Sequence, residues 1–190
     1  MKKTILLLAI ILTSCSRPLY IKDKHFDCTK VRYEMDSDLK ELVYKSLQRA
    51  VVVEKDIQEY QSIWKKNRIY VLNQFQLNET LGLPKSNSVK KDYKYLKLNE
   101  IPNKIGNVAF CLKSKSELQT IANKTWEDFL FLSFSMIKIE KDTATVKVNN
   151  TWKVSKHSQK IYLSGGGYTC MYKKIKGEWK FDKIISRWIS

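Results

Sequence analysis

The 190-residue chain has little of what marks enzymes and metal proteins. Its two histidines, His25 and His157, are expected to be solvated surface residues, because neither lies in a recognisable site context. There is no His-Glu-x-x-His, Cys-x-x-Cys or Gly-x-Ser-x-Gly sequence. Three glycines at 165–167 interrupt a strand-like run, a setting that favours a bulge over an anion-binding loop. The sequence therefore supports no metal site, no cofactor and no assignable catalytic residue.

Long apolar runs are also missing from the chain. The unbroken apolar run at 5–12 is far shorter than the stretch of about 20 residues that a membrane-spanning helix needs. Lys2 and Lys3 precede this run, and Leu12-Thr13-Ser14-Cys15 ends it. A positive start followed by a short apolar run is typical of a secretory signal peptide.

The Leu12-Thr13-Ser14-Cys15 sequence resembles the lipobox of bacterial lipoproteins. The resemblance implies that a diacylglyceryl group is attached to the sulfur of Cys15 and that residues 1–14 are removed. Two or three acyl chains anchor a protein stably, whereas a single chain holds it marginally. Ser16 rather than an aspartate follows the cysteine, which favours the outer membrane over the inner one. The alternative is an ordinary cleaved signal with a chance cysteine.

Acidic residues are scarce relative to basic ones, at 19 against 35, which gives a net charge of +16. Removal of residues 1–14 takes away two lysines and no acidic residue, so the mature chain carries +14. Arginine, which binds carboxylates and phosphates bidentately, supplies few of these charges. We interpret the charge first as a solvated basic surface, and second as attraction to anionic envelope material such as lipid head groups or acidic polysaccharide. The export signal disfavours a nucleic-acid partner.

Three cysteines follow Cys15, and an exported domain meets an oxidising compartment. Cys28, Cys111 and Cys170 allow one disulfide, in three possible pairings. We expect Cys111 to pair with Cys170, because both lie in strand-like runs. The alternative is that all three are reduced and pack as small apolar groups.

The chain is expected to contain a lipidated cysteine and tether at 15–27 and a single domain at 28–190, which is long enough for a hydrophobic core. Asp38 as N-cap, with Glu41 three residues later, predicts the start of a helix. Apolar residues continue at helical spacing as far as Trp64. Three consecutive valines at 51–53 predict a local break in that helix.

The rest of the domain is predicted to be mainly strands. Ser114 and Glu117 form a second capping-box pattern and predict a short helix that ends near Asn123. Strands are predicted at 68–76, 104–112, 128–140, 142–154, 161–175 and 179–189, with a loop at 81–92. Short connections predict an antiparallel, curved meander with the N-terminal helices packed on one face. The expected fold class is α+β.

The C-terminal hairpin carries a second resemblance. Gly177, Trp179 and Phe181 occupy the places of a hairpin with a final aromatic strand that is similar to the nuclear transport factor 2-like or cystatin-like group. The resemblance covers roughly residues 143–190, and the long stretch at 77–104 departs from it. It implies a curved sheet that encloses a conical pocket. Members of the group include enzymes, binding proteins and dimerisation modules, so function does not follow from the fold.

Aromatic residues gather in the last third of the chain. We predict ligand contacts at an open face or pocket mouth from five of them: Trp152, Tyr162, Tyr168, Tyr172 and Trp188. The alternative is that they form a large aromatic core. The resulting hypothesis is an anchored, non-enzymatic envelope domain that binds a ligand or a protein partner. Its alternatives are a pocket enzyme, such as a hydrolase or isomerase, and an assembly accessory protein that could form dimers.

Overall fold

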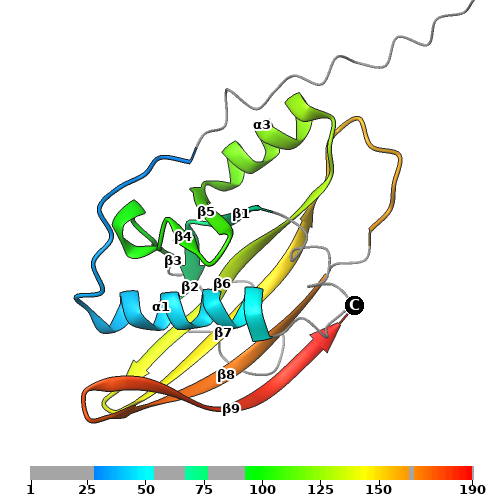
Figure 1. The fold of residues 1–190 in the computed structure, drawn as a ribbon. Helices are drawn as coiled ribbons and strands as arrows, with labels where there is room; N and C mark the ends of the chain where they lie inside the picture. The colour runs from blue at the N-terminus through cyan, green and yellow to red at the C-terminus, as the bar shows by residue number, and fades with distance from the viewer. Residues whose placement is uncertain (1–27, 54–66, 77–92, 163–164, 190) are drawn as a thin grey trace, which may run out of the picture.

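The computed structural model describes residues 28–53, 67–76, 93–162 and 165–189. Within these ranges a curled, mostly-sheet α+β fold carries a helix near its N-terminal end (Figure 1). The helical elements are α1 (Asp38–Gln48), η1 (Arg49–Val53), η2 (Leu98–Glu100) and α3 (Lys115–Thr125). The strands are β1 (Arg68–Leu72), β2 (Gln74–Gln76), β3 (Tyr93–Tyr95), β4 (Lys104–Ile105), β5 (Val108–Lys113), β6 (Phe129–Glu140), β7 (Thr143–Lys153), β8 (Gly166–Ile175) and β9 (Glu178–Ile189).

The four long strands β6 to β9 form the antiparallel meander that the alternating sequence predicts. The first strands behave differently, because β1 pairs in parallel with both β5 and β6. Parallel strands need a long crossover rather than a tight turn, and α3 lies in the connection from β5 to β6. The sheet order is β4-β5-β1-β6-β7-β8-β9, so the expected purely antiparallel sheet is wrong at this edge.

Both predicted helix starts exist, with one change of cap. Ser37, not Asp38, is the N-cap of α1, and its side chain accepts a hydrogen bond from the amide of Lys40. Asp38 occupies the first helical turn, where a carboxylate complements the helix dipole. At α3 the Ser114–Glu117 capping box is present as predicted. The helix predicted as far as Trp64 changes to a π-helical turn at Arg49–Val53. The predictions for 54–66 and for the loop at 81–92 lie outside the described residues.

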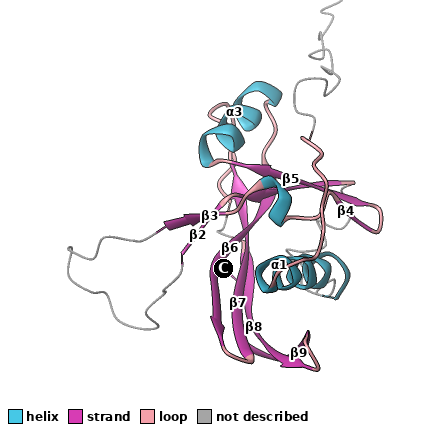
Figure 2. Ribbon diagram, turned by 90° about the vertical axis from the view of Figure 1, so that its left-hand side faces the viewer, coloured by secondary structure: helices cyan, strands magenta, loops and turns pink. Residues whose placement is uncertain are grey.

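Helix α1 lies inside the curl of the sheet, and Figure 2 shows β4 and β5 on one side of it and β9 on the other. The predicted layer of several N-terminal helices is present only in part, because in the described ranges α1 is the one regular α-helix that precedes the sheet. The other α-helix of the described ranges, α3, stands at the far end of the molecule from the β8–β9 turn (Figure 1).

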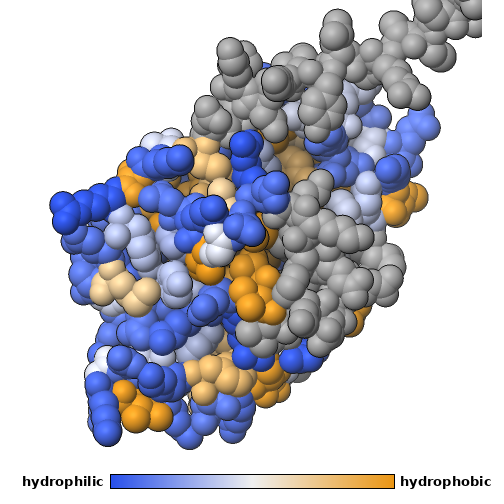
Figure 3. Space-filling model, viewed as in Figure 1, coloured by the Kyte–Doolittle hydropathy of each residue, from blue (hydrophilic) through white to orange (hydrophobic). Residues whose placement is uncertain are grey.

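The surface is mainly hydrophilic on the face shown in Figure 3, where apolar residues form small, separate patches. Large hydrophobic side chains that are more than 60% exposed include Trp126, Tyr95, Ile161 and Ile189. Scattered exposed apolar residues of this kind are normal for folded proteins. These apolar side chains therefore mark no docking surface by themselves.

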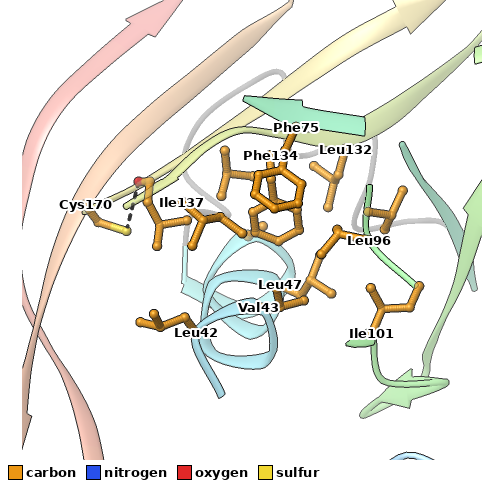
Figure 4. Close-up of a cluster of buried hydrophobic side chains, with 14 of the residues drawn as sticks. Leu42, Val43, Leu47, Phe75, Leu96, Ile101, Leu132, Phe134, Ile137 and Cys170 are labelled. Carbon is orange, nitrogen blue, oxygen red and sulfur yellow. Dashed lines mark hydrogen bonds between the residues drawn. The ribbon is translucent and has the colours of Figure 1, made fainter. Parts of the chain in front are cut away.

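The core joins one face of α1 to the concave face of the sheet. Leu42, Val43 and Leu47 are fully buried and point toward side chains of β6 that include Leu132 and Phe134 (Figure 4). These helix positions follow the spacing of one helical face, while the strand positions alternate. Burial of one such side chain contributes about 1.5–3 kcal/mol. This apolar contact is the main force that holds the curl closed.

The cysteine pairing differs from the prediction. Cys111 of β5 forms a disulfide with Cys28, and their Cα atoms are 4.9 Å apart. Cys170 of β8 is not part of a disulfide and is fully buried, with its Sγ 3.6 Å from the carbonyl oxygen of Val146. In the sheet β1, β6 and β7 separate β5 from β8, which places these strands about 19 Å apart at the usual strand spacing. Because Cys111 is bonded to Cys28 and three strands lie between β5 and β8, the predicted Cys111–Cys170 pairing is wrong.

We predict that the Cys28→Ser/Cys111→Ser double variant of the released domain, residues 16–190, is less stable by about 2–5 kcal/mol, because the crosslink restrains a long loop in the unfolded chain. Urea unfolding measures this loss when the free energy of unfolding of the double variant, and that of the reduced natural chain, is compared with that of the oxidised natural chain. Peptide mapping without reductant should recover Cys28 joined to Cys111. A peptide joining Cys111 to Cys170 would contradict the pairing.

Candidate functional site

A groove lies between the end of α1 with η1 and the outer strands β8 and β9. It encloses about 360 Å³, within the range of about 300–1,000 Å³ that is usual for small-molecule sites. The lining residues are Lys45, Gln48, Arg49, Val52, Tyr172, Trp179, Lys180 and Phe181. We call this hollow the cationic groove. Of the five aromatic residues predicted to contact a ligand, Tyr172 is the one that lines it.

Strand pairing assembles the aromatic wall of the cationic groove. Tyr172 of β8 lies opposite Phe181 of β9 in the sheet, and their rings meet edge to face with centroids 6.1 Å apart. Trp179, two residues before Phe181, is fully buried on the same strand. Phe181 stays 41% exposed, so one ring of the wall is open to a ligand. An edge-to-face pair of this kind gives a fixed apolar surface.

The positive side chains of the groove come from two directions. The guanidinium of Arg49, at the start of η1, lies 3.8 Å from the centroid of the Phe181 ring in a cation–π contact. Lys45, one turn earlier, pairs with Glu41 at 3.2 Å. Lys180 of β9 pairs with Glu178 at the groove's rim. Two of the three cations are therefore paired with glutamates that stand beside the lining, and none of the described lining residues is itself acidic.

Two predicted ligand residues, Tyr168 and Tyr172, form hydrogen bonds that hold α1 in place. The hydroxyl of Tyr168 donates to the carbonyl oxygen of Ser46 at 3.0 Å, and that of Tyr172 lies 3.1 Å from the Ser46 hydroxyl. Both tyrosines and Ser46 are buried. Burial is the main cause that raises the pKa of Tyr172 far above its ordinary value, so its phenol is neutral near pH 7. The aromatic-core alternative therefore holds for Tyr168, which is fully buried.

Trp152 and Tyr162 lie at the opposite end of β7. Their rings stack with centroids 4.2 Å apart. Burial and the carboxylate of Asp128 raise the pKa of Tyr162. Asp128 also accepts hydrogen bonds from the amide of Ser155 at 2.7 Å and the hydroxyl of Ser158 at 2.5 Å. These contacts fasten the loop after β7 and lie apart from the cationic groove.

Trp188 lies on the other face of the sheet, beside Gly167. A Cβ atom at Gly167 would lie 2.5 Å from Nε1 of Trp188 and 2.6 Å from Oδ1 of Asn149. The glycine therefore makes room for the indole. The predicted bulge is not at the glycines, since the register shifts between β8 and β9 fall at 169–172. Gly165 instead has a φ of +102° and touches the backbone of Asn150, where no side chain fits.

His157 does not form a catalytic relay in this structure. Its ring stacks on the indole of Trp126 with centroids 3.8 Å apart, and its amide donates to the Ser155 hydroxyl. Trp126 is 70% exposed, so this stack stands at the surface. His25 lies outside the described residues, as does the lipidation candidate Cys15. Within the described ranges no group of three potential metal ligands occurs.

We predict that Tyr172→Phe makes stability less sensitive to alkaline pH. A phenol with a raised folded-state pKa contributes stability that is intact below about pH 10, the unfolded value, and is lost as the pH rises above it. The natural chain should lose up to about 1.4 kcal/mol more per pH unit above pH 10 than Tyr172→Phe does. Urea unfolding from pH 9 to 11.5 measures this difference. Ser46→Ala is the control, because it keeps the phenol buried and should retain the steep loss; equal slopes for all three proteins would refute the assignment.

None of the helices in the described ranges combines the length and the apolar character that crossing a bilayer requires. No family model, curated protein or solved structure matches the chain. The resemblances to the lipobox and to the nuclear transport factor 2-like or cystatin-like group therefore stay predictions from the sequence.

Proposed function

We propose that the chain is a lipid-anchored protein of the bacterial envelope whose domain binds an amphiphilic anion in the cationic groove. The composition of the groove carries this proposal. The Arg49 guanidinium lies over the Phe181 ring, Lys45 and Lys180 are each paired with a glutamate outside the lining, and the aromatic wall supplies apolar surface. A ligand with an anionic head and an apolar body would satisfy both parts.

The side chains present favour binding over catalysis. The described lining contains no histidine, cysteine, serine or carboxylate that could act as a nucleophile or general base. The phenol of Tyr172 faces Ser46, and its raised pKa keeps its proton in place. The groove can therefore bind an anion through its positive charge and its shape, but these residues give it no group for proton transfer. This supports a binding domain ahead of the hydrolase or isomerase alternative.

The proposal includes the finer architecture expected from the sequence, in which N-terminal helices pack on one face of the curved sheet. Its support is the buried cluster that joins α1 and the turn η1 to the strands. Arg49 and Val52, which flank the buried Ala50 and Val51, form part of the wall of the cationic groove.

The anchor is proposed to be Cys15 in the outer membrane. We expect a full-length chain expressed in bacteria to incorporate labelled palmitate and to separate with the membrane fraction. Cys15→Ser should remain unlabelled and should leave that fraction, because the acyl chains are lost. Ser16→Ala is the matched control and should be labelled like the natural chain. Labelling of the Cys15→Ser variant would refute the anchor.

For the groove, we predict that the released domain, residues 16–190, binds dodecanoate but not dodecyltrimethylammonium, which has the same alkyl chain and the opposite charge. Arg49→Gln should weaken dodecanoate binding by about tenfold or more, because a hydrogen bond to a charged group contributes about 1.5–3 kcal/mol. Calorimetry below the micellar concentration measures both.

Lys104→Gln is the charge-matched control for this measurement. Lys104 is an exposed residue of β4 that does not line the cationic groove. Its removal should leave dodecanoate binding unchanged. Equal binding of the anion and the cation, or an equal loss in both variants, would refute an anion site in the groove.

A further inference from the structure

A second hollow of about 520 Å³ lies at the opposite end of β7 from the cationic groove. It is formed where β2 and β3 meet the beginning of α3 and the end of β7. The lining residues are Asn73, Gln74, Tyr95, Ser114, Lys115, Ser116, Gln119 and Lys153. We call it the polar pocket, because apart from the Tyr95 ring its lining consists of amides, hydroxyls and ammonium groups.

Two lysines give the polar pocket a positive charge that its own wall does not balance. Both line the same hollow, and burial, followed by the positive charge of Lys115, lowers the pKa of Lys153. The Lys153 ammonium donates to the amide oxygen of Gln119 at 3.4 Å, a neutral partner. No acidic residue is among the described lining. An anionic group between the two lysines would relieve this repulsion.

The carboxylate closest in sequence, Glu117, is already engaged. It accepts hydrogen bonds from the amide of Ser114 at 2.7 Å and from its hydroxyl at 2.8 Å, which closes the capping box of α3. Its other partner is Lys113, at 3.7 Å. Glu117 therefore does not neutralise Lys115 and Lys153. The positive charges of Lys115 and Lys153 therefore remain available to an anionic ligand.

The neutral part of the lining fits a hydroxyl-rich molecule with a ring. The ring of Tyr95 is 61% exposed at the edge of the pocket, where it offers a flat apolar face. The side-chain amides of Asn73 and Gln74 can donate to and accept from hydroxyl groups. The backbone of Asn73 is fixed, since it donates to the carbonyl of Lys113 at 3.0 Å and accepts from the amide of Leu96 at 2.7 Å.

Hydrogen bonds of Gln119 also fix the two elements that form the polar pocket, α3 and the end of β7. The side-chain amide of Gln119 donates to the carbonyl of Val154 at 2.9 Å and to the Asn123 side chain at 3.1 Å. These bonds tie α3 to the end of β7, so the two elements that carry Lys115 and Lys153 are held in place relative to each other. A site with a preformed charge and fixed amides requires little ordering when its ligand binds.

From this arrangement we infer that the polar pocket binds an acidic saccharide, with the sugar's carboxylate between Lys115 and Lys153 and its ring against Tyr95. The inference does not depend on the cationic groove, which lies elsewhere and lacks hydroxyl-binding amides apart from Gln48. It assigns a partner class, acidic polysaccharide, to named residues.

The test uses the released domain, residues 16–190, with oligogalacturonate and its fully methyl-esterified form as probes, in about 150 mM salt so that exposed charges are screened. The two probes have the same rings and hydroxyl groups and differ in charge. We expect calorimetry to show binding of the acid and at least about tenfold weaker binding of the ester. Lys153→Gln, Lys115→Gln and Tyr95→Ala should each weaken binding of the acid by a similar factor, while thermal unfolding checks that each variant is folded.

Two controls separate this site from the charge of the whole chain and from the groove. Lys183→Gln removes one exposed positive charge of β9, and Arg49→Gln alters the cationic groove; both should bind the acid like the natural domain. An equal loss in Lys183→Gln and Lys153→Gln would overturn the inference, because it would show non-specific attraction to a basic protein. Equal binding of acid and ester, or no binding of the acid, would overturn it as well.

Discussion

The rest of the structure depends on how α1 is seated in the curl of the sheet. Apolar side chains supply most of that contact, but polar bonds set its register. Ser46 meets the hydroxyls of Tyr168 and Tyr172, and Glu41 accepts a hydrogen bond from the amide of Trp179 at 3.0 Å. A hydrophobic contact is non-directional, whereas a buried hydrogen bond that is lost costs about 1–3 kcal/mol. These bonds therefore select one position of the helix among several that would bury similar area.

The position of α1 in turn creates the cationic groove. The chain changes from α-helix to a π-helical turn at Arg49, where Ala50 and Val51 stay in the core and the Arg49 guanidinium lies over the Phe181 ring. The same bonds explain why tyrosines with buried hydroxyls lie behind a surface lined by cations. Stability and the proposed binding thus share residues, and Tyr172 takes part in both.

Local patterns predicted most of the elements. Alternation identified β7, and the Ser114–Glu117 box located α3 within a residue or two, because both depend on side chains that are close in sequence. The parallel pairing of β1, the Cys28–Cys111 disulfide and the two hollows depend on segments that are far apart. The aromatic residues show the same limit, since strand register alone decides whether Tyr168 is buried in the core or Trp188 lies on the other face. Arg49 and Lys153 carried no signal in the sequence, because each is one cation among 35.

The disulfide has a mechanical consequence. With Cys15 anchored as proposed, the 13 residues from Cys15 to Cys28 can hold the domain at most about 45 Å from the membrane surface. Tension in that tether reaches the crosslink before it reaches the irregular chain that leads to α1. The crosslink passes the load to β5, whose neighbours in the sheet are β4 and β1. A force on the anchor is therefore borne by hydrogen-bonded strands. It does not act on α1, whose position defines the cationic groove.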